Sequence, residues 1–270
     1  MREQLHETVR FLKNQGIDAP EVGVVLGTGL GKFADHLTIT HTIPYEEIPH
    51  FPVATVEFHR GKLIFGTCHG KKVLLMQGRF HFYEGYSMQQ ITYPIRVMKL
   101  LGISHLLLSN AAGGINASYK KGDLVMLEDH INLQPDNPLR GANDSTLGSR
   151  FPDMSQPYDK SMRQKLAQIA QQQQVSIKEG VYASVMGPNL ETRAEYRFLG
   201  RIGADMVGMS TVPEVIVAVH MGLPCLAVSV ITDECDPDNL QPVDIQEIIF
   251  IAGQADVKLS SLFAALVGAL

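Results

Sequence analysis

Apolar residues gather along the chain in short runs that are rich in leucine and β-branched residues. Runs of this length with few polar positions are typical of strands that are covered on both faces of a sheet. The runs lie at Val22–Leu26, Leu63–Thr67, Val73–Met76, Ser104–Ser109, Leu124–Leu127, Val181–Ser184 and Leu226–Ile231. The pattern therefore predicts a mixed or parallel sheet.

Helical spacing of apolar residues alternates with these runs. Residues about one turn apart occur in four segments, which we expect to be helices. The segments are Leu5–Leu12, Tyr93–Leu101, Met162–Ile169 and Ile245–Ala252. The alternation predicts an α/β fold, with residues 1–270 forming a single domain around a central mixed β-sheet flanked by helices.

The least periodic part of the chain is Gln134–Gln156. It is rich in Pro, Gly, Asn, Asp and Ser. We expect a long surface loop here, and loops of this length inside compact domains are usually functional or disordered.

Charge and hydropathy narrow the class of partner. The 23 Lys and Arg residues against 28 Asp and Glu give a net charge of −5. Such a chain has no global positive field for nucleic acid or an anionic membrane surface, so a small ligand is expected. The longest apolar stretch, Val215–Ile231, is interrupted by His220, Gly222 and Pro224 and predicts a helix, a turn and a strand, not a membrane span.

The cysteines fit a reducing compartment. Cys68, Cys225 and Cys235 are odd in number and lack the CxxC spacing, which fits neither a disulfide scaffold nor a four-ligand zinc site. The acidic cluster Asp233–Asp238 lacks the glycine and closing glutamate of a calcium loop. We predict a cytoplasmic protein without a metal, and the charged N-terminus is not typical of a signal peptide.

Two motifs that follow predicted strands could bind an anion. Gly27–Gly31 has the sequence GTGLG, which permits either a tight turn or close approach of backbone N–H groups to phosphate, with the Thr28 hydroxyl as a further donor. In Gln77–Tyr86, Arg79 offers a planar fork of donors and His81 points to the same side if the segment is extended. Glu84 could orient His81 and favour its charged form; the alternative is a surface ion pair.

Three further motifs leave alternatives open. The small residues of Ser109–Gly114 leave room for a flat ligand, or they form only a tight turn at the exit of the strand. Thr211 and Glu214 form a helix capping box, and Ser210 just before it could bind phosphate at the helix N-terminus. The carboxylates of Glu191 and Asp233 stand at element ends, where they could face a heterocycle or be solvated.

Together the motifs resemble those of trimeric purine nucleoside phosphorylases, in the family that includes methylthioadenosine phosphorylases. The matching segments are GTGLG at Gly27–Gly31, HRGKL at His59–Leu63, MQGRFHFYEGY at Met76–Tyr86, NAAGGIN at Asn110–Asn116, DHINL at Asp129–Leu133, NPLRG at Asn137–Gly141, GPNLETRAE at Gly187–Glu195 and GADMVGMSTVPEV at Gly203–Val215. The resemblance implies one α/β domain around a large mixed sheet, assembled as a homotrimer.

The resemblance also assigns roles in binding phosphate and ribose. Phosphate would be held by Thr28, Arg79, His81, Ser210 and the backbone N–H of Ala111. Tyr83 and Met209 would flank the ribose, His59 would lie on a loop closing over phosphate and sugar, and Phe151 would enter the neighbouring subunit's site.

At the purine, the chain departs from the family pattern. Glu191 would accept hydrogen bonds from N1–H and the 2-amino group of a 6-oxopurine, with Asn110 and Tyr182 in support. Asp233 stands where the mammalian-like pattern has asparagine, and Leu190 replaces a phenylalanine. An ionised carboxylate only accepts hydrogen bonds, so Asp233 acts protonated or faces an amino group. No histidine follows Asp233, which leaves the family's 5′-hydroxyl ligand without a counterpart.

The reaction that the resemblance implies is phosphorolysis by a pentosyltransferase, with phosphate as co-substrate and no cofactor. It needs no protein nucleophile, only positioning and charge stabilisation, and the implied catalytic residues are His59, His81, Glu191 and Asp233. The predicted substrates are inosine, guanosine and their deoxy forms. The alternatives are an adenosine or methylthioadenosine phosphorylase, and a non-catalytic nucleoside-binding module, which would have no use for the pair Arg79 and His81.

Overall fold

Helices and strands alternate along the chain as the apolar pattern predicts. The computed structural model describes residues 2–53 and 61–270. The helices are α1 (Arg2–Asn14), α2 (Met88–Leu101), α3 (Lys160–Gln172), α4 (Arg193–Arg201), α5 (Val212–His220) and α6 (Ile245–Ala269). The strands are β1 (Val22–Leu26), β2 (Thr38–Pro44), β3 (Lys62–Cys68), β4 (Lys71–Gln77), β5 (His105–Gly114), β6 (Leu124–Asn132), β7 (Ile177–Ser184), β8 (Met206–Gly208) and β9 (Cys225–Glu234).

The strands form one mixed sheet in the order β2-β3-β4-β1-β5-β8-β7-β6-β9. Strand β5 also pairs with β9, so β5, β8, β7, β6 and β9 close into a ring. Strands β4, β1, β5 and β9 run parallel to their neighbours in this group, whereas β2, β3 and the pair β6 and β9 are antiparallel. The predicted mixed sheet is confirmed.

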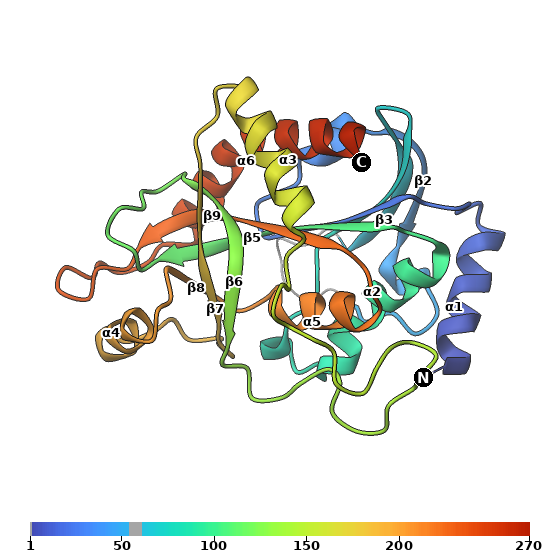
Figure 1. Ribbon diagram of the computed structural model, residues 1–270, viewed down its shortest axis with the longest axis horizontal. Helices are drawn as coiled ribbons and strands as arrows, with labels where there is room; N and C mark the ends of the chain where they lie inside the picture. Colours follow the sequence, from blue (N-terminus) through green and yellow to red (C-terminus); the bar gives the residue numbers. More distant parts are fainter. Residues whose placement is uncertain (1, 54–60) are drawn as a thin grey trace.

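Helices cover both faces of this sheet (Figure 1): α3 and α6 lie on one side, and α1, α2 and α5 on the other. Successive residues of one strand therefore enter different cores. In β1, Val24 packs in the core under α3 and α6, and Val25 in the core under α1, α2 and α5. In β5, Leu107 and Leu108 divide in the same way. This two-sided burial is the reason that the strands are continuous apolar runs.

Helix α6 is the one helix among residues 2–53 and 61–270 that is long and apolar enough to cross a membrane by length and composition. Its Leu259, Leu262, Phe263 and Leu266 are buried in the core against the sheet. The stretch Val215–Ile231 lies within α5, a turn and β9, as its interruptions predict.

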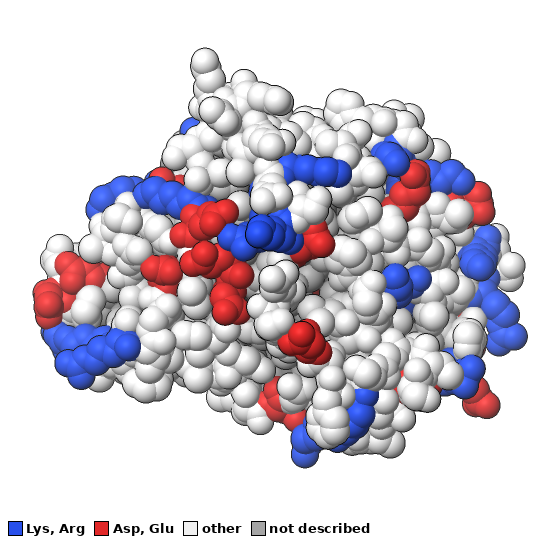
Figure 2. Space-filling view, viewed as in Figure 1, with Lys and Arg blue, Asp and Glu red and all other residues white. Residues whose placement is uncertain are grey.

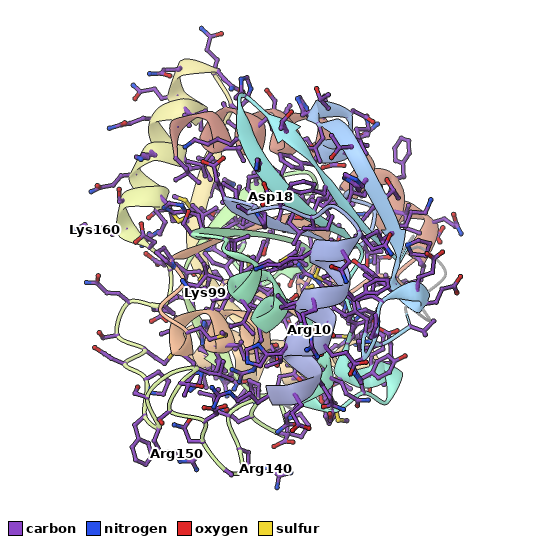
Figure 3. The ribbon with its side chains drawn as sticks, turned by 90° about the vertical axis from the view of Figure 1, so that its right-hand side faces the viewer. Arg10, Asp18, Lys99, Arg140, Arg150 and Lys160 are labelled. Atoms are coloured by element: carbon purple, nitrogen blue, oxygen red, sulfur yellow. The ribbon has the colours of Figure 1, made fainter. Side chains whose placement is uncertain are left out.

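The apolar pattern predicts neither β2 nor β8, and several predicted strands are shorter than the observed ones. Strand β2 is an edge strand with mostly exposed residues, and β8 has only 3 residues, so neither has an apolar run. Strand β7 begins at Ile177, before the predicted Val181. The segment Gln134–Gln156 has neither helix nor strand, as predicted, and its Arg140 and Arg150 project at the lower edge of the molecule in Figure 3.

The topology brings the candidate motifs together. Because β4, β1, β5 and β9 are parallel, their carboxyl ends meet at one edge of the sheet, where α/β proteins bind ligands. Thr28 and Arg79 follow the ends of β1 and β4, Asp233 lies near the end of β9, and Asn110 lies within β5. On the molecular face in Figure 2, Lys and Arg side chains are interspersed with Asp and Glu, so this face has no large patch of one charge.

Candidate functional site

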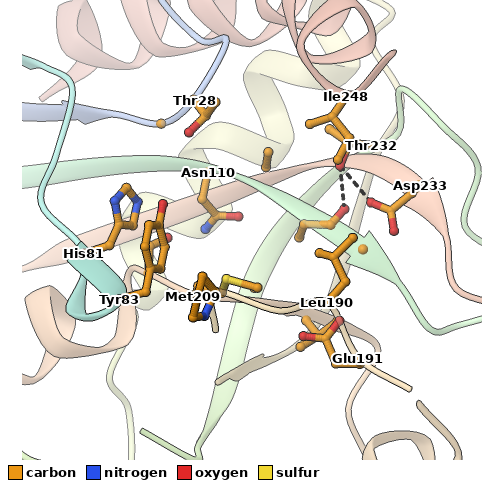
Figure 4. Close-up of a pocket in the computed structure, with 18 of the residues that line it drawn as sticks. Thr28, His81, Tyr83, Asn110, Leu190, Glu191, Met209, Thr232, Asp233 and Ile248 are labelled. Atoms are coloured by element: carbon orange, nitrogen blue, oxygen red, sulfur yellow. Dashed lines mark hydrogen bonds between the residues drawn. The ribbon is translucent and has the colours of Figure 1, made fainter. Parts of the chain in front are cut away.

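A cavity of about 340 Å³ opens at the shared strand edge. Figure 4 shows His81 and Tyr83 on one side of it and Glu191 and Asp233 on the opposite side. Residues from β5, β9, the segments after β1 and β4, the turn before α5 and the first turn of α6 line it. The cavity therefore has two chemically different ends.

Arg79 forms the floor of the first end and is only 1% exposed. Its Nη1 donates to the hydroxyl oxygens of Ser210 and Thr211 at 3.0 Å each, and Nη2 donates to the Val25 carbonyl at 3.3 Å. Its Nε lies 3.7 Å from Glu214 Oε1. Burial raises the pKa of Glu214, while Arg79 and the Thr211 N–H lower it. The charged Arg79 is thus fixed beside the cavity by hydroxyl groups and a buried carboxyl.

Helix α5 begins at this end of the cavity, directly after Thr211, whose backbone is strained. Thr211 has φ of +68° although it is not glycine, and such strain concentrates at functional sites. Its N–H donates to Glu214 Oε2 at 3.0 Å and its hydroxyl contacts Arg79 and Asn110, which confirms the capping box. Ser210 therefore lies at a helix N-terminus, where the helix dipole favours an anion.

His81 lines the same end, with 6% of its surface exposed. Its Nδ1 lies 2.9 Å from Glu84 Oε1, and its backbone N–H donates to the same oxygen at 2.8 Å. Glu84 thus orients the ring as predicted. However, burial lowers the pKa of His81 and outweighs the opposite effect of Glu84. Glu84 therefore favours the imidazolium as predicted, but burial, together with the nearby Arg79, sets the net direction of the pKa.

Thr28 completes the first end from the turn after β1. This turn lies directly on β5, because a Cβ on Gly27 would meet the Asn110 Cα and the Ser109 carbonyl oxygen at 2.8 Å each. The Gly27 N–H donates to the Ser109 hydroxyl at 3.3 Å. The glycine therefore places Thr28 and Ala111 on one wall of the cavity.

Met209 stands between the two ends of the cavity, and Tyr83 lies beside His81. The rings of Tyr83 and His81 are stacked, with centroids 4.7 Å apart and planes 12° apart. Burial raises the pKa of Tyr83 to about 12, so its hydroxyl stays protonated at neutral pH. These side chains offer a flat, mostly apolar surface with a hydroxyl donor.

Glu191 and Leu190 line the second end from the segment before α4. Burial raises the pKa of Glu191, a hydrogen bond from Tyr196 lowers it, and Asp233 raises it. Leu190 is 43% exposed and leaves this wall open. A carboxyl at this position can accept from a ring N–H or an amino group.

Asp233 faces Glu191 across this end because of a β-bulge in β9. Ala112 pairs with Ile231 and Gly113 with Asp233, so Thr232 is the extra residue. Both Thr232 and Asp233 then line the cavity, although successive strand residues ordinarily point to opposite faces. The Thr232 hydroxyl donates to Asp233 Oδ1 at 3.0 Å, and the Cys235 thiol to Oδ2 at 3.1 Å.

Comparison with known proteins matches residues 21–268 to the model of the phosphorylase superfamily. The chain is 45% identical over 267 residues to purine nucleoside phosphorylase 1 of Bacillus subtilis, covering 99% of this chain and 98% of that one. It is 43% identical over 275 residues to the Bos taurus purine nucleoside phosphorylase, covering 99% and 95%.

The chain belongs to the purine nucleoside phosphorylases. A crystal structure of the Schistosoma mansoni purine nucleoside phosphorylase in complex with adenosine superposes with a TM-score of 0.94 at 42% identity, covering 99% of this chain and 97% of that one. A schistosoma purine nucleoside phosphorylase in complex with hypoxanthine gives 0.93 at 41% identity, with the same coverages. The family resemblance and the implied fold are confirmed.

The structure brings most of the predicted purine nucleoside phosphorylase site residues into the cavity. Those lining it are Thr28, Arg79, His81, Tyr83, Asn110, Ala111, Leu190, Glu191, Met209, Ser210 and Asp233. The Asn110 amide is occupied with the protein itself, since Nδ2 donates to the Thr211 hydroxyl at 2.9 Å and Oδ1 accepts from Ser229 at 2.7 Å. It supports the wall of the cavity.

Two predicted residues lie elsewhere. Tyr182 is fully buried behind the wall, where its hydroxyl accepts from the Ser210 N–H at 3.3 Å. Phe151 is 87% exposed and lines a separate hollow formed by the Gln134–Gln156 loop, so it takes no part in this chain's own cavity. His59 lies outside the described residues.

Sequence reasoning missed Thr232, Tyr196, Ile245 and Ile248, which also line the cavity. The bulge that exposes Thr232 has no local sequence signal. Ile245 and Ile248 were identified only as the start of a helix, and the contact of this helix with the cavity depends on the fold. Among residues 2–53 and 61–270, no group of three His, Cys, Asp or Glu side chains could hold a metal ion.

Proposed function

We propose that this cavity catalyses the phosphate-dependent cleavage of the N-glycosidic bond of purine nucleosides, with inosine, guanosine and their deoxy forms as preferred substrates. The observation that supports it is the division of one cavity into an end with Arg79, His81 and a helix N-terminus, and an end with two facing carboxyl groups. The first end suits a small anion and the second a base rich in N–H groups.

Phosphate is held by the Thr28 and Ser210 hydroxyls, the Ala111 N–H, Arg79 and His81. The buried Arg79 supplies a fixed charge, and its contacts with Ser210 and Thr211 keep the hydroxyl donors in place. An anion beside His81 favours the imidazolium, which burial disfavours. Phosphate binding is therefore accompanied by proton uptake at His81.

The reaction is a displacement at the sugar C1′. The C1′–N9 bond breaks and its electron pair passes to the purine, while a phosphate oxygen forms the new bond to C1′. The products are the free purine and ribose 1-phosphate, or its deoxy counterpart. The protein contributes orientation and charge stabilisation, with Tyr83 and Met209 beside the ribose.

Glu191 recognises the purine by accepting from N1–H and the 2-amino group of a 6-oxopurine. Burial raises the pKa of Glu191, so the hydrogen bonds that it accepts replace lost hydration. Adenine lacks the N1–H, and Glu191 therefore favours hypoxanthine and guanine as leaving groups.

A second candidate activity is phosphorolysis of adenosine or methylthioadenosine. Two observations favour it: both oxygens of Asp233 accept hydrogen bonds from protein donors, as in a carboxylate that can accept from a 6-amino group, and the first turn of α6 presents Ile245 and Ile248 to the cavity. An apolar wall there suits a 5′-alkylthio group better than a 5′-hydroxyl.

We also propose a homotrimer in which Phe151 enters the neighbouring site. The 87% exposure of this apolar side chain supports the proposal, because it leaves the ring accessible to a neighbouring subunit. The free thiols of Cys68, Cys225 and Cys235 fit a cytoplasmic location. Phosphate is the co-substrate, and we propose no cofactor and neither a membrane nor a nucleic-acid partner.

The test is base release from inosine, adenosine and methylthioadenosine at matched concentrations, with and without phosphate. The proposal requires release that depends on phosphate and is fastest with inosine. Preference for an adenine nucleoside would favour the second candidate. Release that ignores phosphate would indicate a hydrolase, and no release would indicate a nucleoside-binding module.

A further inference from the structure

A group of buried side chains lies behind the purine end of the cavity, next to its two carboxyl groups. The Tyr196 hydroxyl interacts with both Glu191 and Cys235. The Cys235 thiol in turn donates to Asp233 Oδ2 at 3.1 Å. Cys235 and Tyr196 are 1% and 2% exposed, so solvent does not compete for these contacts.

The backbone makes a specific place for this thiol. A Cβ on Gly113 would lie 2.6 Å from the Cys235 Sγ and 3.1 Å from Asp233 Oδ2. Gly113 pairs with Asp233 directly after the bulge at Thr232. The missing side chain of Gly113 and the bulge therefore allow the thiol and the carboxyl to lie side by side.

The thiol stays a donor. Burial and the neighbouring Asp233 raise the pKa of Cys235, so it keeps its proton at neutral pH. Burial likewise raises the pKa of Tyr196, whose hydroxyl proton is directed to Glu191 or to Cys235. The only proton on Sγ is then available to Asp233.

The two oxygens of Asp233 differ in their surroundings. Oδ1 contacts the Thr232 hydroxyl at 3.0 Å, and that hydroxyl also lies 3.4 Å from the Ala112 carbonyl oxygen. The single proton of the Thr232 hydroxyl is thus shared between Ala112 and Asp233 Oδ1, whereas the Cys235 thiol donates to Asp233 Oδ2 alone. Cys235 is therefore the contact that distinguishes an accepting Asp233 from a donating one.

We propose that Cys235 is a positioning residue that holds Asp233 as a hydrogen-bond acceptor toward the purine 6-position, and thereby sets the relative turnover of 6-amino and 6-oxopurine nucleosides. The inference rests on the proposed function. A 6-amino group donates to an accepting carboxylate, whereas a 6-oxo group needs a donor. Loss of the thiol then shifts preference away from adenosine and toward inosine.

The experiment compares Cys235→Ala with Cys235→Ser by the ratio of kcat/KM for adenosine to that for inosine. The ratio is taken within one sample, so a loss of folded enzyme affects both rates equally and cancels. The expected result is a ratio lowered about three- to tenfold in Cys235→Ala, the effect of one hydrogen bond, and a ratio close to wild type in Cys235→Ser. Cys225→Ala is the matched control, because its buried thiol contacts the Pro157 carbonyl oxygen away from the cavity.

Two results overturn the role of Cys235 alone: an unchanged ratio in Cys235→Ala, or equal shifts in the Ala and Ser variants. If Cys235→Ala yields no folded enzyme, the Cys235→Ser variant provides the test. Serine keeps a hydrogen-bond donor, so a shift of the ratio by about tenfold in Cys235→Ser would contradict the proposal that a donor at this position holds Asp233. The combination of Cys235→Ala with Asp233→Asn must give the ratio of Asp233→Asn by itself. A wild-type enzyme that releases no base from either nucleoside in phosphate overturns the proposed function and this inference together.

Discussion

Replacing Arg79 by methionine tests the phosphate end of the cavity most directly. Methionine keeps much of the length of the side chain but removes its charge and donors. Two consequences follow from the contacts of Arg79: the hydroxyls of Ser210 and Thr211 lose a common donor, and Glu214, 3% exposed, loses its cation. One consequence concerns phosphate, and the other the stability of the fold.

The stability effect is large because both partners are buried. Removing one member of a buried ion pair costs about 3–5 kcal/mol, against a total of about 5–15 kcal/mol for a typical domain. Burial raises the pKa of Glu214, and Arg79 and the Thr211 N–H lower it. The variant loses the larger of the two lowering causes, so the pKa of Glu214 rises further. A carboxyl whose pKa is higher in the folded protein than in the unfolded chain becomes protonated in the folded protein at a higher pH. The free energy of unfolding therefore increases again as the pH falls. The loss must be smaller near about pH 5.5 than near about pH 8.

The measurement is urea unfolding of Arg79→Met, Glu214→Gln and the double variant at both pH values. Glutamine keeps the acceptor for the Thr211 N–H and removes the charge, so the double variant should recover about 1–3 kcal/mol of the loss at the higher pH. In kinetics, KM for phosphate should rise roughly 10- to 100-fold, as expected for lost charged hydrogen bonds, and more than KM for inosine. No recovery in the double variant contradicts the ion-pair argument, and equal changes of both KM values contradict the assigned role of Arg79.

Three further predictions concern other parts of the site. Sulfate affinity, measured by calorimetry, should increase as the pH falls through the range where His81 becomes protonated, because an anion favours the imidazolium. The variant His81→Gln should show a weaker dependence of sulfate affinity on pH. The same dependence in wild type and His81→Gln would refute the prediction. Gly113→Ala should displace Cys235 and Asp233, which a Cβ would approach to 2.6 and 3.1 Å, and lower kcat/KM about tenfold or more at under about 3 kcal/mol loss of stability; unchanged kinetics would show that the bulge adapts. Phe151→Ala should weaken nucleoside binding without changing unfolding in urea, and sedimentation of both forms as monomers would exclude the trimer.

Much of the fold could be predicted from the sequence because burial on two faces gives a strand a continuous apolar run. Val22–Leu26 was predicted with its observed ends. Strand β2 could not be found in this way, since an edge strand with one exposed face lacks the run. The closure of five strands into a ring depends on the second pairing of β5 with β9, which no local pattern specifies.

The site was predicted to the extent that its residues stand at strand ends. Arg79 and Thr28 follow apolar runs directly, so parallel strands suffice to bring them to one edge. Charge states were less predictable, because the position of Glu84 next to His81 is visible in the sequence while the burial that lowers the pKa of His81 is not. The bulge at Thr232 could not be predicted either, since it depends on how β9 pairs with β5.

The two ends of the cavity therefore differ in how firmly their chemistry is fixed. At the phosphate end, Arg79 is always charged and Thr211 is held by Arg79, Asn110 and Glu214 at once, so a single substitution disturbs several contacts. At the purine end, each oxygen of Asp233 has one short contact, with a hydroxyl and with a thiol. Small changes at the purine end can then alter the preferred base while the phosphate end, on which cleavage itself depends, stays the same.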